Sequence, residues 1–189
     1  MNGDYLKWKN VKLVKYEDKY FDYIYDFYQD YNSRHLFTNN LNIESKKKLW
    51  DEIKKKLNYM YHEFMIIINV KKQIPVGFIY SYDYNPQNNY LYIAIFIEEK
   101  ERNDVFGAEA GIIFLNYLFN YYPIRKIYCT VYEYNKASMK FLQNAGFKIE
   151  GILKEHRYFN GKYHNMNILA FYREELSTLT QRLKFNAKS

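Results

Sequence analysis

The stretch Asn135–Gly151, NKASMKFLQNAGFKIEG, indicates the fold more clearly than any other part of the sequence. Its first half has the spacing of a short helix. Asn135 or Ser138 can start that helix as an N-cap, and Gly146 can end it as a C-cap. A hairpin is expected directly after it, because Asn160-Gly161 is a strong signal for a two-residue hairpin turn. The stretch therefore predicts a helix followed by two antiparallel strands.

Upstream of this stretch, a helical segment separates two strand-like segments. The runs YLYIAIFI (90–97) and KIYCTVYEY (126–134) are rich in β-branched and aromatic residues, which indicates strands. Between them, apolar residues recur at helical spacing from Gly107 to Tyr121. We expect the two strands to pair in parallel, because a helical crossover connects them.

The N-terminal half contains the remaining expected elements. Asp18 can cap a first helix, and Asn42 or Ser45 can start a second one. These elements are, in order, a strand over 11–16, a helix over 18–31, a helix from residue 42 or 45 to Leu57, and strands over 63–70 and 74–84.

The order of these elements predicts a mixed α/β (α+β) fold, in which helices cover both faces of a central sheet. No repeat or Pro/Gly-rich linker divides the 189 residues, and the length suits one globular domain. We therefore expect a single domain over residues 1–189.

The composition favours a cytoplasmic protein and argues against several other classes. The single cysteine, Cys129, cannot form an internal disulfide, and no apolar run reaches the roughly 18 residues of a membrane span. The net charge of +7 suits an anionic partner such as a phosphate-bearing cofactor. However, acidic residues interrupt the basic runs, as in ESKKKLWDEIKKKL (44–57), and there is no zinc-binding spacing. We expect no membrane, nucleic-acid or metal partner.

Three segments resemble the GNAT superfamily of N-acetyltransferases, and most closely its ribosomal-protein-alanine and spermidine branches. Residues 135–151 match the pattern N-x-x-S-x-x-x-L-x-x-x-G-F-x-x-E-G, and the segments RNDVFGAEA (102–110) and NGKYHNMNILAF (160–171) are similar to two others. The resemblance implies a mostly antiparallel sheet of about seven strands, with a splay between strands 4 and 5. It also implies direct transfer of an acetyl group from acetyl-CoA to a primary amine.

The resemblance assigns acetyl-CoA to the loop at 102–108, the helix start after it and the strand before it. Amides at a helix N-terminus and an arginine side chain can bind pyrophosphate. Backbone groups of the strand would pair with the pantetheine arm, and one amide would polarise the thioester carbonyl. Asn135 would contact the arm from the other side, although it also suits an N-cap. The residues expected to bind acetyl-CoA are Ile95, Phe96, Ile97, Arg102, Asn103, Phe106, Gly107, Ala108, Asn135 and Ser138.

Val105 and Asp104 depart from the family pattern in this loop. The family has glycine where this chain has Val105, and a β-branched residue at positive φ costs about 1–3 kcal/mol. We therefore expect a reshaped loop in which Val105 has negative φ. Asp104 either repels pyrophosphate or caps the helix. Acetyl-CoA is still expected to bind, with lower affinity.

Ser138 is the candidate acid. Acyl transfer to an amine needs a base for the ammonium and benefits from an acid for the leaving thiolate. Many GNAT members place a tyrosine as the acid shortly before the Gly-Phe pair, but this chain has Leu142 there. The ribosomal-protein branch also lacks that tyrosine, and its proposed serine acid matches Ser138. The alternative is an ordinary serine in the first turn of a helix.

Several residues are candidates for the base. The glutamate base of the ribosomal-protein branch matches Arg157 here, so that role does not carry over. Glu155 and His156 lie next to this position, and strand alternation places Glu155 on the face of Arg157 and His156 on the other face. A histidine titrates near neutrality, and His164, across the hairpin, can pair with Glu155 or His156. Glu98 is a further candidate that would act through water. Each of these is equally an ordinary surface residue.

The acceptor is expected over the first two helices and the final hairpin. The segment YQDYNSRHLF (28–37) is its predicted wall, and Asp26 and Asp30 can attract a cationic amine. The alternative is that most of these aromatic residues pack a helix onto the sheet. The acceptor is expected to be a small amine, an amino sugar or a peptide N-terminus. The residues expected to bind it are Tyr28, Tyr31 and His35.

Two other functions stay open at this point. A catalytically weak or inactive CoA-binding module is favoured by the joint departures at Val105, Leu142 and Arg157. A basic domain that binds nucleic acid or the ribosome is favoured by charge alone. The expected partners are acetyl-CoA and an amine, and a homodimer is also left open.

Overall fold

A computed structural model of the chain describes residues 6–30, 34–36, 45–59, 61–102 and 105–186. Its strands form one mixed, mostly antiparallel sheet of eight strands in the order β1-β2-β3-β4-β5-β6-β8-β7. The predicted sheet of about seven strands is therefore confirmed, with the two-residue strand β1 (Lys7–Trp8) in addition. No helix in the described ranges is long and apolar enough to span a membrane.

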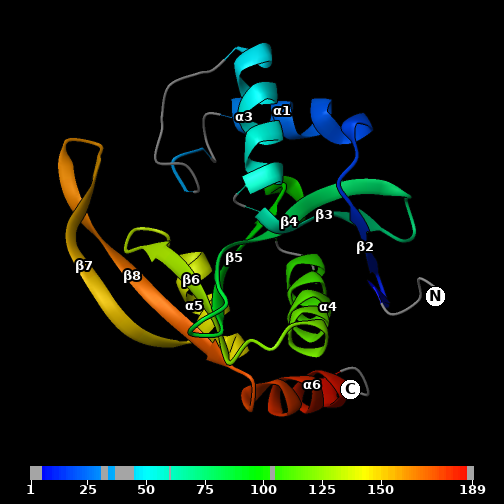
Figure 1. Cartoon of the computed structure of the whole chain (residues 1–189), viewed down its shortest axis with the longest axis vertical. Helices are drawn as coiled ribbons and strands as arrows, with labels where there is room; N and C mark the ends of the chain where they lie inside the picture. Colours follow the sequence, from blue (N-terminus) through cyan, green and yellow to red (C-terminus); the bar gives the residue numbers. More distant parts are fainter. Residues whose placement is uncertain (1–5, 31–33, 37–44, 60, 103–104, 187–189) are drawn as a thin grey trace. The chain divides into compact units, whose positions relative to one another are not determined.

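The chain divides into two compact units. The N-terminal unit contains Met1–Asp83 and Ala94–Ile113, and the C-terminal unit contains Tyr84–Ile93 and Phe114–Ser189. The strand β5 (Tyr90–Ile97) and the helix α4 (Phe106–Tyr121) each run from one unit into the other (Figure 1).

The N-terminal unit consists of an antiparallel meander and two helices. Its ladders join β1 to β2, β2 to β3 and β3 to β4. A short 3₁₀ turn precedes α1, which packs against α3 (Figure 1). The elements are β2 (Val11–Lys15), η2 (Asp18–Tyr20), α1 (Phe21–Gln29), α3 (Lys46–Tyr59), β3 (Tyr61–Asn69), β4 (Ile74–Asn85) and η3 (Glu99–Glu101).

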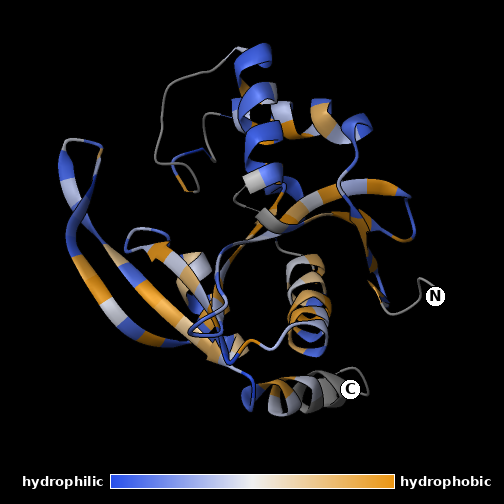
Figure 2. Cartoon of the chain, viewed as in Figure 1, coloured by the Kyte–Doolittle hydropathy of each residue, from blue (hydrophilic) through white to orange (hydrophobic). Residues whose placement is uncertain are grey.

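Aromatic packing dominates the core of the N-terminal unit. Phe21, Ile24 and Phe27 form the buried stripe of α1, as their spacing predicts, and they meet the side chains of β3 and β4. Phe78 lies at the centre, with ring centroids 5.0 Å from Phe27 and 4.8 Å from Phe96. Burial of these side chains holds α1 on the sheet. Most residues of α3 are hydrophilic (Figure 2).

The C-terminal unit contains β6 (Lys126–Tyr132), α5 (Lys136–Ala145), β7 (Lys148–Phe159), β8 (Lys162–Tyr172) and α6 (Glu175–Asn186). β7 and β8 form a long hairpin (Figure 1), and β8 pairs with β6 on its other side. Leu169 and Phe171 of β8 are fully buried, and Phe171 lies 5.1 Å from Phe147 and 6.1 Å from Phe119 between ring centroids.

Most element predictions are confirmed. β5 pairs with β6 in parallel at Tyr90–Tyr92, as the crossover predicts. Asn135 caps α5, and Gly146 ends it with φ of 102°. Asn160 and Gly161 both have positive φ, which a type I′ hairpin turn requires. The predicted splay concerns residues of different units and stays a prediction.

Two element predictions need correction. Asp18 does not cap a helix with its side chain, because it lies inside the 3₁₀ turn and forms an ion pair with Lys54. The C-terminal helix α6 was not predicted.

Candidate active site

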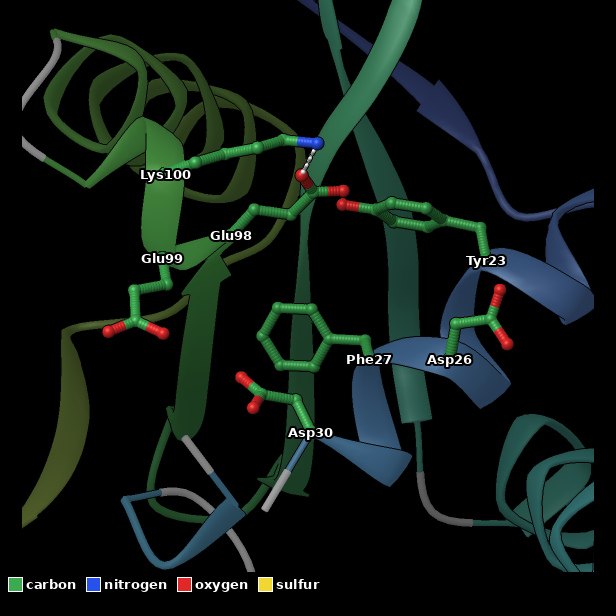
Figure 3. A pocket seen from close by; sticks show the side chains of 7 residues that line it. All are labelled: Tyr23, Asp26, Phe27, Asp30, Glu98, Glu99 and Lys100. Carbon is green, nitrogen blue, oxygen red and sulfur yellow. Dashed lines mark ion pairs between the residues drawn. The ribbon is translucent and has the colours of Figure 1, made fainter. Parts of the chain in front are cut away.

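A cavity of about 560 Å³ in the N-terminal unit is lined by residues of α1 and of the segment after β5 (Figure 3). Four carboxylates and one ammonium line it, which is a formal net charge of −3, whereas the whole chain carries +7. Its lining residues are Tyr23, Asp26, Phe27, Asp30, Glu98, Glu99 and Lys100. The sequence predicted Asp26 and Asp30 as attractants for an amine and Glu98 as a candidate base, and the structure brings these three residues to one cavity.

The spacing of residues along α1 and the position of Glu98 at the end of β5 explain why these groups line one cavity. Tyr23, Asp26 and Phe27 are three or four residues apart and lie on one face of α1, and Asp30 is the C-cap residue that follows the helix. Phe27 packs its ring 6.2 Å from that of Phe96, which anchors this face beside the end of β5. Glu98 follows the last residue of β5, and its amide donates to the carbonyl of Val76 at 3.0 Å.

Glu98 is the most strongly engaged carboxylate in the cavity. Its Oε2 lies 2.7 Å from Nζ of Lys100, and its side chain is 21% exposed. The phenol oxygen of Tyr23 faces the same carboxylate (Figure 3). Burial, and next the negative charge of Glu98, raise the pKa of Tyr23, so the phenol stays protonated at all ordinary pH values. Glu98 therefore lies between a cation and a proton donor at the cavity wall.

The start of α4 fits a phosphate group. An α-helix leaves its first amides without intrahelical acceptors, and Phe106, Gly107 and Ala108 form this first turn. A backbone hydrogen bond at this end runs from the amide of Glu109 to the carbonyl of Val105 at 3.0 Å. Val105 is 46% exposed, and the expected reshaped turn stays a prediction.

Arg102 is exposed and also binds the protein backbone. Its Nε donates to the carbonyl of Ile97 at 3.1 Å, so the guanidinium is fixed at the end of β5. The predicted ligands Asn103 and Asp104 lie outside the described residues.

The strand segment Ile95–Ile97 is half-buried in the structure. The side chain of Phe96 belongs to the aromatic core, where its ring contacts Phe78 and Tyr80. The part of Phe96 that suits a cofactor is therefore its backbone, which agrees with the predicted pairing in β fashion.

Asn135 and Ser138 lie together at the start of α5. The amide of Ser138 donates to Oδ1 of Asn135 at 3.1 Å, which is an N-cap. The N-cap interpretation of Asn135 is thus confirmed. Its side-chain nitrogen and the hydroxyl of Ser138 are the groups left to consider for a ligand, and their predicted roles stay predictions.

Glu155 and His156 lie in a bulge of β7. Leu153 pairs with Met166 and Arg157 with His164, so three residues of β7 face one residue of β8. Glu155 has φ of 47°, and both Glu155 and His156 are exposed. The prediction from strand alternation was wrong here, because a bulge interrupts the two-residue period on which it depends.

Arg157 is buried, with 6% of its surface exposed, and its guanidinium lies 5.1 Å from the centre of the Tyr132 ring. It therefore contributes to packing at the position where the related branch has a glutamate.

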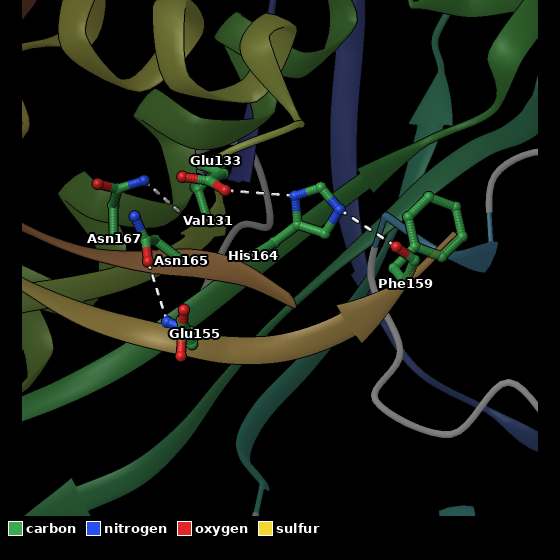
Figure 4. A network of polar contacts seen from close by, with 7 residues as sticks. All are labelled: Val131, Glu133, Glu155, Phe159, His164, Asn165 and Asn167. Atoms are coloured by element: carbon green, nitrogen blue, oxygen red, sulfur yellow. Dashed lines mark hydrogen bonds and ion pairs between the residues drawn. The ribbon is translucent and has the colours of Figure 1, made fainter. Parts of the chain in front are cut away.

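A polar network on β8 surrounds this bulge, and in it His164 contacts Glu133 and Phe159 instead of the expected Glu155 or His156 (Figure 4). Nδ1 of His164 lies 3.3 Å from Oε1 of Glu133, and Nε2 lies 3.2 Å from the carbonyl of Phe159. Oδ1 of Asn165 accepts the Glu155 amide at 2.9 Å. A backbone hydrogen bond from Asn165, and next the interaction with His164, lower the pKa of Glu133. Sequence analysis identified His164 but missed the contributions of Glu133, Asn165 and Asn167.

Glu109 is a second residue whose role sequence analysis missed. It is 7% exposed in the first turn of α4, and its two oxygens accept from the backbone amide of Asn10 at 2.9 Å and from its side-chain amide at 2.8 Å. The sequence signal was the glutamate within the segment RNDVFGAEA (102–110). Its carboxylate serves the turn between β1 and β2.

The predicted acceptor wall is only partly described. Tyr31 lies outside the described residues. Tyr28 packs near Phe78, with 6.4 Å between ring centroids, and burial raises its pKa to about 12. Neither Tyr28 nor His35 lines the cavity described above. The aromatic residue Tyr28 thus packs against the core, and the cavity lies on the neighbouring face of α1.

Comparisons with known proteins identify the family. Residues 10–148 match the model of the acetyltransferase (GNAT) domain. The SPbeta prophage-derived uncharacterized N-acetyltransferase YokL of Bacillus subtilis (strain 168) is 29% identical over 115 residues, which are 60% of this chain and 64% of that protein. The alignment therefore spans less than two thirds of that relative.

Two solved structures have a similar fold. Spermidine N-acetyltransferase from Vibrio cholerae, in complex with CoA and spermine, has a TM-score of 0.81 at 18% identity and covers 89% of this chain and 98% of its own. A GNAT family acetyltransferase from Bacillus anthracis has a TM-score of 0.76 at 18% identity and covers 90% and 99%.

The chain belongs to the GNAT acetyltransferase family. Members of this family are N-acetyltransferases, and acetyl-CoA is their co-substrate.

Proposed function

We propose that the protein transfers the acetyl group of acetyl-CoA directly to a primary amine of a small molecule that carries more than one positive charge. The observation that carries this proposal is the acidic cavity, whose net charge of −3 is opposite in sign to that of the chain. A concave site with one sign of charge raises the local concentration of ligands of the other sign. The spermine bound in the similar Vibrio cholerae structure is a ligand of this chemical class.

The residues of the cavity suit the proton chemistry of the reaction. The attacking amine must first lose a proton, and Glu98 can accept it directly or through one water molecule. Lys100 pairs with this carboxylate, while Asp26 and Asp30 bind the remaining positive charge of the acceptor. Acetyl-CoA supplies the acetyl group when it is bound, and its phosphates suit the first turn of α4. Ser138 remains the proposed proton donor to the leaving thiolate, and Glu155 and His156 remain alternative bases.

An acceptor panel tests the proposal. Purified protein is mixed with acetyl-CoA and an alkyl monoamine, an alkyl diamine, a polyamine, an amino sugar or a short peptide, and thiol release is measured. We expect kcat/KM to be highest for the diamine or polyamine. The combined change Asp26→Asn and Asp30→Asn should raise KM for the diamine about tenfold, with a smaller effect on the monoamine.

Asp22→Asn is the matched control, because Asp22 lies on the same helix but pairs with Lys46 outside the cavity. Its KM values should equal those of the wild type. Binding of acetyl-CoA without thiol release from any amine would instead favour the inactive CoA-binding module. A preference for the peptide that the aspartate changes leave unaltered would contradict a cationic small-molecule acceptor.

A further inference from the structure

Gly77 occupies a place in β4 where no side chain fits. A Cβ built on it would lie 2.1 Å from the carbonyl oxygen of Phe96, 3.0 Å from Cδ1 of Ile97 and 3.2 Å from its Cα. Real Cβ atoms essentially never approach another atom closer than 3.0 Å. The nearest obstacle is backbone, so rotation of a side chain cannot relieve the contact. Gly77 is therefore required by the close approach of β5.

The backbone around Gly77 explains why β5 comes so close. Gly77 pairs with Ile67 and Pro75 with Ile68, so Val76 is an extra residue that bulges out of the ladder with β3. The carbonyl of Val76 accepts the amide of Glu98 at 3.0 Å. The bulge at Val76 and the missing side chain of Gly77 thus both affect the position of the same three residues, Phe96, Ile97 and Glu98.

Ile97 connects this contact to the cofactor loop. Its carbonyl accepts from Arg102 at 3.1 Å, and its Cγ1 lies 3.4 Å from the Cβ position of Gly107 in the first turn of α4. Ile97 is therefore packed between two glycines, one in β4 and one at the phosphate-binding end of α4. A shift of Ile97 would move both the strand end and the contacts of the loop.

We propose that Gly77 is a positioning residue for acetyl transfer: by lacking a side chain it sets the backbone of Phe96–Ile97 and the carboxylate of Glu98. This inference rests on the proposed function, since it takes these residues to be part of the site. Any larger residue must open the gap to Phe96 from 2.1 Å to at least 3.0 Å. A misplacement of about 1 Å can reduce catalysis about 100-fold.

Three identical Gly→Ala changes test the proposal. Gly77→Ala should lower kcat/KM about 100-fold, mainly through kcat. It should also change the shape of the pH–rate profile, because Glu98 moves, and should speed hydrogen exchange of the Glu98 amide. Gly107→Ala, with ordinary contact at 3.4 Å, should have a smaller effect. Gly111→Ala is the control, because no atom lies within 4 Å of its added Cβ, and it should behave as the wild type.

The proposal is overturned if Gly77→Ala has the kinetics and the pH profile of Gly111→Ala. It is also overturned if Gly77→Ala is unfolded at the assay temperature, because Gly77 would then serve folding of the sheet rather than placement of the site. If the wild type releases no thiol with any amine, the proposed function fails separately. The role of Gly77 is then tested by calorimetric measurement of acetyl-CoA affinity. We expect Gly77→Ala to bind acetyl-CoA about tenfold more weakly than Gly111→Ala.

Discussion

Glu109 is a buried carboxylate that holds a distant turn rather than a ligand. Its two hydrogen bonds to Asn10 join residues that are 99 positions apart in the chain. Removal of the carboxylate leaves the backbone and side-chain amides of Asn10 without this charged acceptor. We expect Glu109→Ala to lower the free energy of unfolding by about 2–3 kcal/mol, measured by urea denaturation.

Asn10→Ala and the double variant complete this test. Asn10→Ala retains the backbone amide, so its effect should be smaller than that of Glu109→Ala. Because the two residues contact each other, the double variant should be less destabilised than the sum of the single effects. Additive effects would show that the two side chains act independently.

Glu150 should make stability depend on acidity. Burial raises the pKa of its carboxyl, but hydrogen bonds from Lys126, Tyr172 and Tyr128 outweigh this and hold the pKa below its ordinary value of 4.5. A carboxyl with a lower pKa in the folded state stabilises the protein above its unfolded pKa. This stability is lost as the pH falls through the folded pKa.

We therefore expect Tm to fall more steeply below pH 4.5 in the wild type than in Glu150→Gln. Above that pH, Glu150→Gln should have the lower Tm. Glu174→Gln, a change at an exposed position, is the control and should retain the slope of the wild type. Parallel curves for the wild type and Glu150→Gln would contradict this account.

At the scale of elements, Arg173 completes the C-terminal end of α4. Its guanidinium donates to the carbonyls of Phe119, of Tyr122 at 2.8 Å and of Ile124 at 2.7 and 2.9 Å. The last carbonyls of a helix lack intrahelical donors, and a cation there also suits the helix dipole. A lysine cannot reproduce this planar fork of donors.

Arg173→Lys should therefore lower the free energy of unfolding by about 1–2 kcal/mol, and Arg173→Ala by more. Calorimetric melting measures both. Arg125→Lys is the matched control, because the hydrogen bonds of Arg125 are formed by its backbone, and it should have little effect. Equal stability of Arg173→Lys and the wild type would mean that charge alone suffices.

Local signals explain why most elements were predictable from sequence. The cap of α5, the Gly146 stop and the Asn160-Gly161 turn each depend on one or two residues, and all three are confirmed. The bulge at Glu155 depends instead on the side chain of Asn165 across the hairpin. A pattern along one strand cannot reveal such a partner.

The same distinction applies to the candidate site. Asp26, Asp30 and Glu98 were each identifiable as charged residues at suitable places, but their shared cavity depends on how α1 packs beside β5. The role of Gly77 is even harder to predict from sequence, because its φ is ordinary and only the close approach of Phe96 makes glycine necessary.

At the scale of the whole molecule, net charge is a poor guide to the partner. The chain carries +7, yet the cavity in the N-terminal unit carries −3. The positive residues lie mostly on solvated surfaces such as that of α3, where they affect solubility. The local field at this cavity favours a cation, which is the basis of the proposed acceptor.

Cys129 can report whether the two units unfold together. It is the single cysteine, it is buried in the C-terminal unit, and burial raises the pKa of its thiol. A thiol reagent should therefore label it only when the surrounding structure opens. Because β5 and α4 each continue from one unit into the other, we expect opening to involve both units.

Two destabilising variants, one in each unit, test whether the units unfold together. Glu109→Ala weakens the N-terminal unit and Arg173→Ala the C-terminal unit. If unfolding is cooperative, both should speed the labelling of Cys129, by about tenfold for each 1.4 kcal/mol of lost stability. Faster labelling in Arg173→Ala alone would show that the C-terminal unit opens independently. In that case the chain would behave as two folding units that share β4, β5 and α4, and the expectation of a single domain would be wrong.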